Sequence, residues 1–156
     1  MSAAATEKVI KALVVALRAR DVALDGVLLK IAMVLPGDAS GSSSNDEEVA
    51  RETMNTLQKS VPEDIGGIVY LSGGQSDDDA FRRLGAIASL NTARAKDKRD
   101  TGVWHMSFSF GRALQRAALK AWAGKEDTDT IRNAQRILVE KCKLASSSSA
   151  SLAATS

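Results

Sequence analysis

The hydrophobic pattern of this chain alternates between helical and strand spacing. Residues 6–20 place apolar side chains every three or four positions with basic residues between them, which is typical of an amphipathic helix. After a break at Asp25-Gly26, eight of the nine residues 27–35 are apolar. A short, nearly continuous apolar run predicts a strand that is covered on both faces, as strands of parallel sheets are.

Helical spacing then returns. Residues 38–44 are small and polar and are predicted to form a loop. Asn45 or Ser44 is the predicted N-cap of the next helix, because Glu48 or Glu47 stands three residues further on, as a capping box requires.

A second strand is predicted over residues 68–71, and residues 72–76 form the loop after it. Ser76 is the predicted N-cap of a helix that ends near residue 90, because three aspartates follow it and acidic side chains are favourable in a first helical turn. Residues 91–102 are polar with mixed charge and are expected to form an exposed loop.

A third strand is predicted over residues 103–110, where apolar side chains occupy the even positions. Gly111-Arg112 leads directly into a helix that ends near Gly124. Thr128 or Asp129 is the predicted cap of a last helix.

The predicted order is α-β-α-β-α-β-α-α, and helices between successive strands argue for parallel βα units. The expected fold class is therefore α/β, with three parallel strands and flanking helices over residues 1–145 and a Ser/Ala-rich, disordered tail over residues 146–156. Three parallel strands leave two unpaired edges and much apolar surface uncovered. The chain is expected either to be part of a larger barrel or to pair with another copy, and the pattern alone favours neither.

Composition narrows the classes of function. The 156 residues carry 21 Lys and Arg against 19 Asp and Glu, a net charge of +2, which gives no argument for a nucleic-acid or membrane partner. The apolar runs are far shorter than the roughly 20 residues of a membrane span, and a secretory signal is not recognisable. One cysteine, Cys142, excludes an internal disulfide, and one histidine, His105, excludes a metal site with two imidazoles. We expect a soluble, non-secreted domain.

Lys30 interrupts the first apolar run. A buried ammonium is costly, so the side chain either reaches solvent or loses its proton. A desolvated, neutral lysine amine attacks a carbonyl and forms an imine. A lysine at an exposed strand edge is the alternative, and the pattern alone favours it.

Two glycine-containing loops follow the other two strands. Ser72-Gly73-Gly74 precedes a helix N-terminus, where backbone N–H groups can approach a phosphate, although a plain tight turn explains it equally well. Ser109-Phe110-Gly111-Arg112 places a cationic side chain at the start of a helix, which indicates a bound anion or is simply a surface arginine. One candidate amine and two candidate phosphate-binding loops thus lie at the same end of three successive strands. This arrangement suits a phosphorylated ketone or aldehyde that is handled through a Schiff base.

Five segments of the chain closely resemble class I fructose-bisphosphate aldolase. They are LDGVLLK (24–30), MVLPG (33–37), IVYLSGGQS (68–76), SFSFGRALQ (107–115) and LKAWAGK (119–125). The resemblance implies a TIM barrel, of which this chain matches only the last three strands. It also implies that Lys30 is the lysine that condenses with the C2 carbonyl of dihydroxyacetone phosphate. No metal cofactor is implied, because the protonated imine is the electron sink.

The resemblance further assigns the C1 phosphate of the substrate to the two glycine loops. The residues that match the phosphate-binding positions of the family are Ser72, Gly73, Gly74, Ser109, Gly111 and Arg112.

The chain also departs from the family pattern. Ile31-Ala32 replaces the Pro-Asn that follows the Schiff-base lysine, the stretch 92–101 is longer than usual, and the C-terminal tyrosine of the family has no counterpart. In the family, earlier strands supply the carboxylates and further lysines that act as acid and base and bind the second phosphate. Cleavage of the C–C bond needs a general base on the C4 hydroxyl. Asp38 is close in sequence to the first strand, but its place on a loop does not favour it.

Two functions remain open. The first is a lyase of glycolysis that reversibly cleaves fructose 1,6-bisphosphate to dihydroxyacetone phosphate and glyceraldehyde 3-phosphate. The second is an inactive remnant that only binds sugar phosphate or associates with other chains. In either case we expect self-association or a complementing chain to cover the open strand edges. A cytoplasmic location is expected, and some similarity to the plastid and algal branch leaves a plastid open.

Overall fold

The computed structural model describes residues 3–37, 44–95 and 104–152. Helices and strands alternate in the predicted order, so the α/β class with flanking helices is confirmed. The helices are α1 (Ala3–Arg18), α2 (Asp46–Ser60), α3 (Asp77–Ala95), α4 (Arg112–Trp122) and α5 (Thr128–Ser149). The strands are β1 (Leu28–Ala32), β2 (Gly67–Leu71) and β3 (Met106–Phe108), and short 3-10 turns lie at Leu24–Gly26 and Ala150–Leu152.

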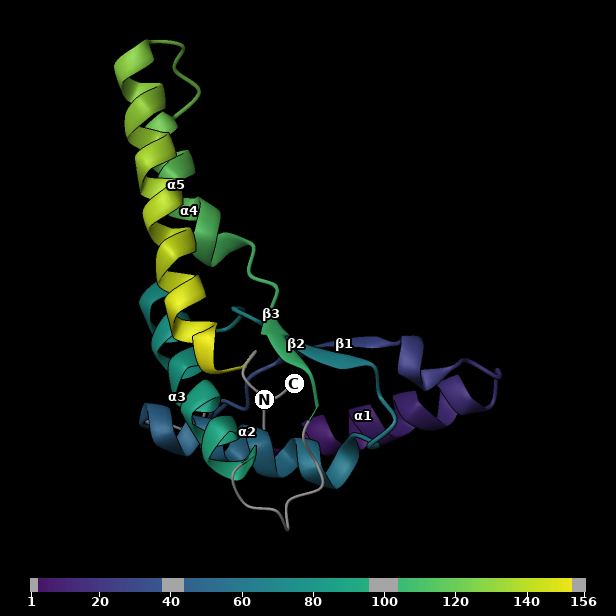
Figure 1. Ribbon diagram of the computed structural model, residues 1–156. Coiled ribbons are helices and arrows are strands. Elements are labelled where there is room, and N and C mark those ends of the chain that lie inside the picture. The colour runs from purple at the N-terminus through teal and green to yellow at the C-terminus, as the bar shows by residue number, and fades with distance from the viewer. Residues whose placement is uncertain (1–2, 38–43, 96–103, 153–156) are drawn as a thin grey trace.

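The three strands form one parallel sheet in the order β1-β2-β3 (Figure 1). Leu29 pairs with Ile68, and Ile68 pairs with Met106, so these three side chains form one row across the sheet. Because successive side chains of a strand point to opposite faces, the next row points the other way. β1 and β3 are the edge strands of this sheet.

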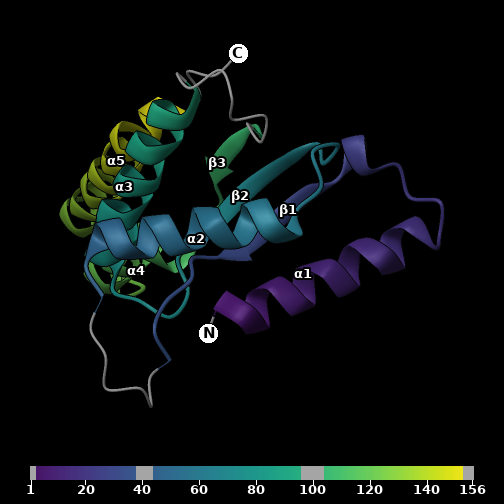
Figure 2. The same ribbon diagram turned by 90° about the horizontal axis from the view of Figure 1, so that it is seen from below.

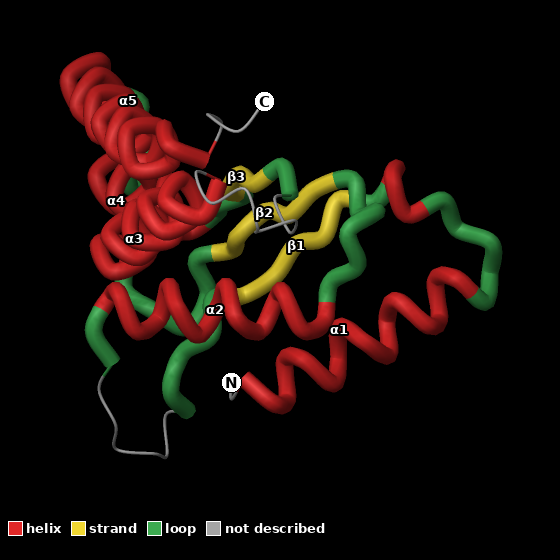
Figure 3. Tube along the Cα trace, turned by 60° about the horizontal axis from the view of Figure 1, so that its bottom comes forward, coloured by secondary structure: helices red, strands yellow, loops and turns green. Residues whose placement is uncertain are grey.

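Helices α1 and α2 lie along one face of the sheet (Figures 2 and 3). The buried Tyr70 hydroxyl of β2 lies 3.3 Å from Met106 Sδ and 3.7 Å from Met54 Sδ, which places the phenol between a neighbouring strand and α2. Ile68 and Tyr70 are both 0% exposed. Burial raises the pKa of Tyr70 because the phenolate would have to form away from water. We refer to this side as the covered face.

The opposite side, which we call the open face, is exposed to solvent at β1 and β3. Leu28 is 64% exposed, and Lys30 and Ser107 are exposed as well. The prediction that the first strand is covered on both faces is therefore wrong. A strand in a parallel sheet receives its second cover from another layer of structure, and the helices α1 and α2 supply only one.

The predicted helix starts are largely confirmed. Asn45 Oδ1 accepts a hydrogen bond from the Glu48 N–H at 2.8 Å, and Glu48 Oε2 accepts one from the Asn45 N–H at 3.1 Å, which completes the capping box. Ser76 Oγ accepts a hydrogen bond from the Asp79 N–H at 3.1 Å. The last helix differs by one residue, because Asp127 caps it by accepting from the Thr130 N–H at 2.8 Å.

Several boundaries differ from the prediction. β1 is Leu28–Ala32, shorter than the predicted strand over residues 27–35. β3 covers only the middle of the predicted strand 103–110, although Trp104, Met106 and Phe110 are buried as the even-position pattern requires. α3 continues five residues into the predicted loop 91–102, and Asn91 within it is 1% exposed. The rest of that loop from residue 96, together with residue 103, lies outside the described residues.

The C-terminal segment also differs from the expectation. A disordered tail was expected over residues 146–156, but residues 146–149 belong to α5 and residues 150–152 to a 3-10 turn. Residues 153–156 of the expected tail lie outside the described residues. Leu152 is 2% exposed and Ala145 is 0% exposed, so apolar side chains fix this segment against the core. The Ser/Ala-rich composition led to the expectation of disorder, although Ala145 and Leu152 are buried. None of the described helices is long and apolar enough to span a membrane.

Candidate active site

One row of side chains crosses the open face from strand to strand. Lys30 pairs with Val69, and Val69 pairs with Ser107. Lys30 and Ser107 are exposed, whereas Val69 is buried between them. The interpretation of Lys30 as a desolvated amine is therefore wrong, and the exposed position on an edge strand, which the pattern favoured, is confirmed.

The turn after β2 lies against the segment after β1. Gly74 has φ of +78°, a left-handed conformation that glycine adopts without steric cost. A Cβ built on Gly74 would lie 3.6 Å from Leu35 Cδ1, so the two segments are in contact. Ser72 and Gly73 are half-buried and Gly74 is exposed, which leaves this turn accessible from solvent.

The two glycine-containing loops meet each other. The Ser109 N–H donates to the Tyr70 carbonyl oxygen at 2.8 Å, which ties the chain after β3 to the end of β2. Arg112 Nη2 lies 3.9 Å from the position that a Cβ would occupy on Gly73. The structure thus brings Arg112, from the start of α4, to the turn Ser72–Gly74. Ser109, Gly111 and Arg112 are exposed.

This corner of the sheet has the chemistry of an anion site. Gly111 is the N-cap of α4, so it offers no side chain to the first-turn N–H groups. A helix N-terminus carries partial positive charge, and the Arg112 guanidinium adds a full one with forked N–H donors. A phosphate is the anion that such a combination of backbone N–H groups and guanidinium binds well.

Sequence reasoning missed a second set of residues behind the Ser72–Gly74 turn. Arg83 Nη1 of α3 donates to Gln75 Oε1 at 2.8 Å, and Arg83 Nε lies 3.4 Å from Asp46 Oδ1 at the start of α2. Gln75 Nε2 in turn lies 3.5 Å from the sulfur of Met33, which follows β1. Gln75 belongs to a motif that the sequence makes visible, but its partners are 8 and 42 residues away. Only the folded chain brings them together.

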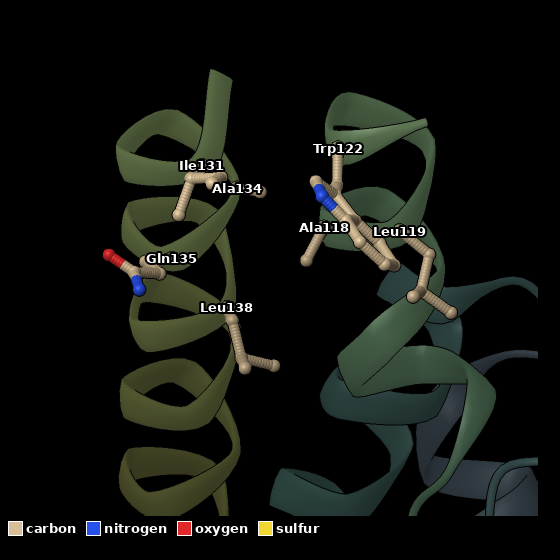
Figure 4. Close-up of a pocket in the computed structure, with 7 residues that line it drawn as sticks. All are labelled: Ala118, Leu119, Trp122, Ile131, Ala134, Gln135 and Leu138. Carbon is tan, nitrogen blue, oxygen red and sulfur yellow. The ribbon is translucent and has the colours of Figure 1, made fainter. Parts of the chain in front are cut away.

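An apolar pocket lies away from these residues. It has a volume of about 210 Å³ and lies between α4 and α5, where Trp122 and Leu119 face Ile131 and Leu138 (Figure 4). Figure 1 shows that this helical hairpin extends away from the sheet. None of the predicted site residues lines it. Asp38, the carboxylate considered as a base, lies outside the described residues.

Comparisons with a family model and with known proteins all indicate the same family. The model of the family "Glycolytic: Fructose-bisphosphate aldolase class-I" matches residues 1–155. The chain is 43% identical over 141 residues to the cytosolic fructose-bisphosphate aldolase 6 of Arabidopsis thaliana. It is 41% identical over 139 residues to the muscle-type fructose-bisphosphate aldolase of Lethenteron camtschaticum.

A solved structure is similar as well. The fructose-bisphosphate aldolase of Plasmodium falciparum, crystallised with TRAP and a small-molecule inhibitor, matches with a TM-score of 0.80 and 32% sequence identity. The match covers 96% of this chain and 40% of that chain. The alignments with the Arabidopsis and Lethenteron proteins cover 90% and 89% of this chain and 36% of each relative. The chain therefore spans a little over a third of the length of these curated relatives.

Proposed function

The chain belongs to the class I fructose-bisphosphate aldolase family, and from this premise we propose that it carries the imine-forming and phosphate-binding part of an aldolase active site. The proposed reaction of the complete site is the reversible cleavage of fructose 1,6-bisphosphate to dihydroxyacetone phosphate and glyceraldehyde 3-phosphate. Lys30 is the proposed nucleophile. The proposed ligands of the C1 phosphate are Ser72, Gly73, Gly74, Ser109, Gly111 and Arg112.

The observation that carries this proposal is the approach of Arg112 to Gly73, on the strand ends beyond Lys30. The guanidinium is 3.9 Å from the position of a Cβ on Gly73, so two loops that are far apart in sequence form one anion-binding corner. Lys30 precedes the end of β1 by two residues, which is about 7 Å along a strand. Since parallel strands end at the same edge of a sheet, the candidate amine and the anion-binding corner are directed toward the same edge, as one phosphorylated ketone would require.

The chemistry proposed for Lys30 is imine formation. The unprotonated form of Nζ adds to the C2 ketone and gives a neutral carbinolamine. The carbinolamine hydroxyl takes a proton from solvent and leaves as water, and the product is a positively charged iminium ion. When a base then removes the C4 hydroxyl proton, the C3–C4 bond breaks, the aldehyde leaves, and the bonding pair moves to C3 as the enamine. Protonation of C3 and hydrolysis of the imine release dihydroxyacetone phosphate and restore Lys30.

The residues assigned above do not include a base that could remove the proton of the C4 hydroxyl. We propose that a complete site needs further strands of the barrel, supplied next to the edge strands β1 and β3. The exposure of Leu28 on the open face supports a further layer of protein there, because a large apolar side chain gains from burial. A complementing chain or a second copy of this chain is the proposed partner, beside the sugar phosphate.

A second candidate function is that of a remnant that binds sugar phosphate without cleaving it. The presence of Ile31-Ala32 where the family has Pro-Asn supports it, since a polar neighbour of the Schiff-base lysine is lost. The two functions differ in whether Lys30 forms a reducible imine. Because two of the plant relatives are named as cytosolic proteins, we propose the cytosol as the compartment for either function.

The test is reductive trapping. The chain is incubated with dihydroxyacetone phosphate and borohydride, and the adduct is located by intact-mass and peptide mass spectrometry. We expect one adduct on Lys30 that is absent in Lys30→Met and Lys30→Arg and kept in Lys120→Met, an exposed lysine of α4. Phosphate binding without an adduct would favour the remnant. Neither an adduct nor phosphate binding at millimolar ligand would reject both functions.

A further inference from the structure

Four residues from four places in the sequence connect the candidate phosphate turn to its surroundings. Gln75 immediately follows the turn Ser72–Gly74, and both polar atoms of its amide have a partner. Its Oε1 accepts from Arg83 Nη1 at 2.8 Å, and its Nε2 lies 3.5 Å from Met33 Sδ. An amide with a partner at each end has one orientation, so the backbone that carries it is restrained as well.

Arg83 is suited to act as an anchor. Its side chain is only 15% exposed, in contrast to the neighbouring Arg82, which is 58% exposed. Arg83 Nε lies 3.4 Å from Asp46 Oδ1, an ion pair without a hydrogen bond, so the Asp46 charge attracts the guanidinium toward α2 while Arg83 Nη1 donates to Gln75 Oε1. A partly buried, charge-assisted contact is stronger than one between solvated groups.

Met33 supplies the other fixed point. It is 2% exposed and lies three residues after Lys30, on the segment that leaves β1. The Gln75 amide therefore joins the turn after β2 to the chain that carries the candidate amine. Gly74 makes a second contact of the same kind, since a Cβ there would lie 3.6 Å from Leu35 Cδ1.

We propose that Arg83 and Gln75 are positioning residues that hold the turn Ser72–Gly74 in the geometry in which it binds phosphate. The inference rests on the proposed function, because it assumes that this turn binds a phosphate. Neither residue touches the ligand in this arrangement. Each acts through the backbone of the turn, and Asp46 fixes Arg83 from α2.

The exposed neighbour Arg82 provides a matched control. It also contacts Asp46, with Nε 3.0 Å from Oδ2, and it pairs with Asp79 within its own helix. Among the described residues, Gln75 Oε1 accepts its hydrogen bond from Arg83 and not from Arg82. Arg82→Leu therefore removes a positive charge from the same helix, and a contact with the same aspartate, but leaves the turn anchored.

The experiment compares Arg83→Leu, Gln75→Leu and Arg82→Leu by NMR in the absence and presence of inorganic phosphate. We expect Arg83→Leu and Gln75→Leu to shift the Met33 methyl signal, to raise the backbone mobility of residues 72–75 and to weaken phosphate binding about tenfold. Arg82→Leu should do none of these. Arg83→Lys, which keeps a donor for Gln75 Oε1, should recover part of the affinity.

Two outcomes would overturn the inference. One is that Arg83→Leu, like Arg82→Leu, changes neither the mobility of residues 72–75 nor the Met33 methyl signal. The other is a mobile turn in Arg83→Leu that binds phosphate as tightly as the original chain. If the original chain binds no phosphate, the proposed function fails. The mobility of residues 72–75 still decides whether Arg83 and Gln75 hold the turn. Gln75→Leu provides the same test if Arg83→Leu does not fold.

Discussion

The two faces of the three-stranded sheet differ although they are built from alternate residues of the same strands. On the covered face, Ile68 and Tyr70 are fully buried beneath the helix layer. On the open face, Leu28 is 64% exposed and Lys30 and Ser107 reach solvent. The covered face holds the fold together, whereas the open face carries exposed polar side chains, among them Lys30, the proposed nucleophile. The predictions below test this division from the largest expected effect to the smallest.

The largest effect is expected from truncation on the covered face. Ile68→Ala should lower the free energy of unfolding by about 3 kcal/mol, because it removes methylene groups from a site that cannot collapse around the loss. Leu28→Ala on the open face should change it by less than about 0.5 kcal/mol. Urea denaturation followed by circular dichroism measures both. Equal losses in the two variants would contradict the division.

The same division explains what could be predicted from the sequence. Helix caps such as Asn45 with Glu48, and the even-position pattern around Met106, depend on residues close together in the chain, and both are confirmed. Whether a second layer covers β1 depends on segments that are not close to β1 in the sequence. The continuous apolar run therefore correctly predicted a strand, but it wrongly predicted that both faces of this strand are covered.

For the candidate site, the positions of the loops could be predicted from the sequence, but the contacts between side chains could not. The places of the two glycine loops at one edge of the sheet follow from the order of elements, because parallel strands end at the same edge. Lys30 lies in the middle of β1, two residues before that edge. The contact between Arg112 and Gly73 and the anchoring of Gln75 by Arg83 could not be predicted. They depend on side-chain directions that only packing between α3, α4 and the sheet determines.

The second prediction concerns a polar group on the covered side. The Thr53 hydroxyl of α2 is buried and accepts a hydrogen bond from the Val34 N–H at 2.9 Å, just after β1. Thr53→Val keeps the shape but leaves that N–H without its acceptor, so we expect a loss of about 2 kcal/mol in urea denaturation. Thr53→Ser keeps the acceptor and should lose less. A smaller loss in Thr53→Val than in Thr53→Ser would show that the methyl group, not the hydrogen bond, matters.

The third prediction concerns the anion-binding corner. Arg112→Met should weaken the binding of inorganic phosphate about tenfold, since a charge-assisted contact to an exposed guanidinium is lost. The free energy of unfolding should hardly change. Arg116→Met is the control one turn later on α4, where the arginine lies 3.7 Å from Asp77. Chemical-shift titration with phosphate gives both affinities, and equal weakening in the two variants would reject a specific role for Arg112.

The smallest effect is expected from pH. A hydrogen bond with Ser76, helped by Arg82, holds the pKa of the Asp79 carboxyl below its usual 3.8 at the start of α3. Because the folded state favours the carboxylate, this contribution to stability is present above pH 3.8 and is lost as the pH falls through the lowered pKa. Solvent screens the exposed first turn of α3, so the effect should be small.

Comparison of the original chain with Asp79→Asn isolates this contribution, because other lowered carboxyls, such as Asp127, titrate equally in both. The urea midpoint of the original chain should exceed that of the variant at pH 7, and the gap should narrow as the pH falls from 3.8 through the lowered pKa. A gap that stays constant over this range would mean that Asp79 stabilises α3 through its shape and hydrogen bonds rather than its charge. The helix that follows the turn Ser72–Gly74 would then be fixed by capping geometry in the same way as α2 is by Asn45 on the covered side.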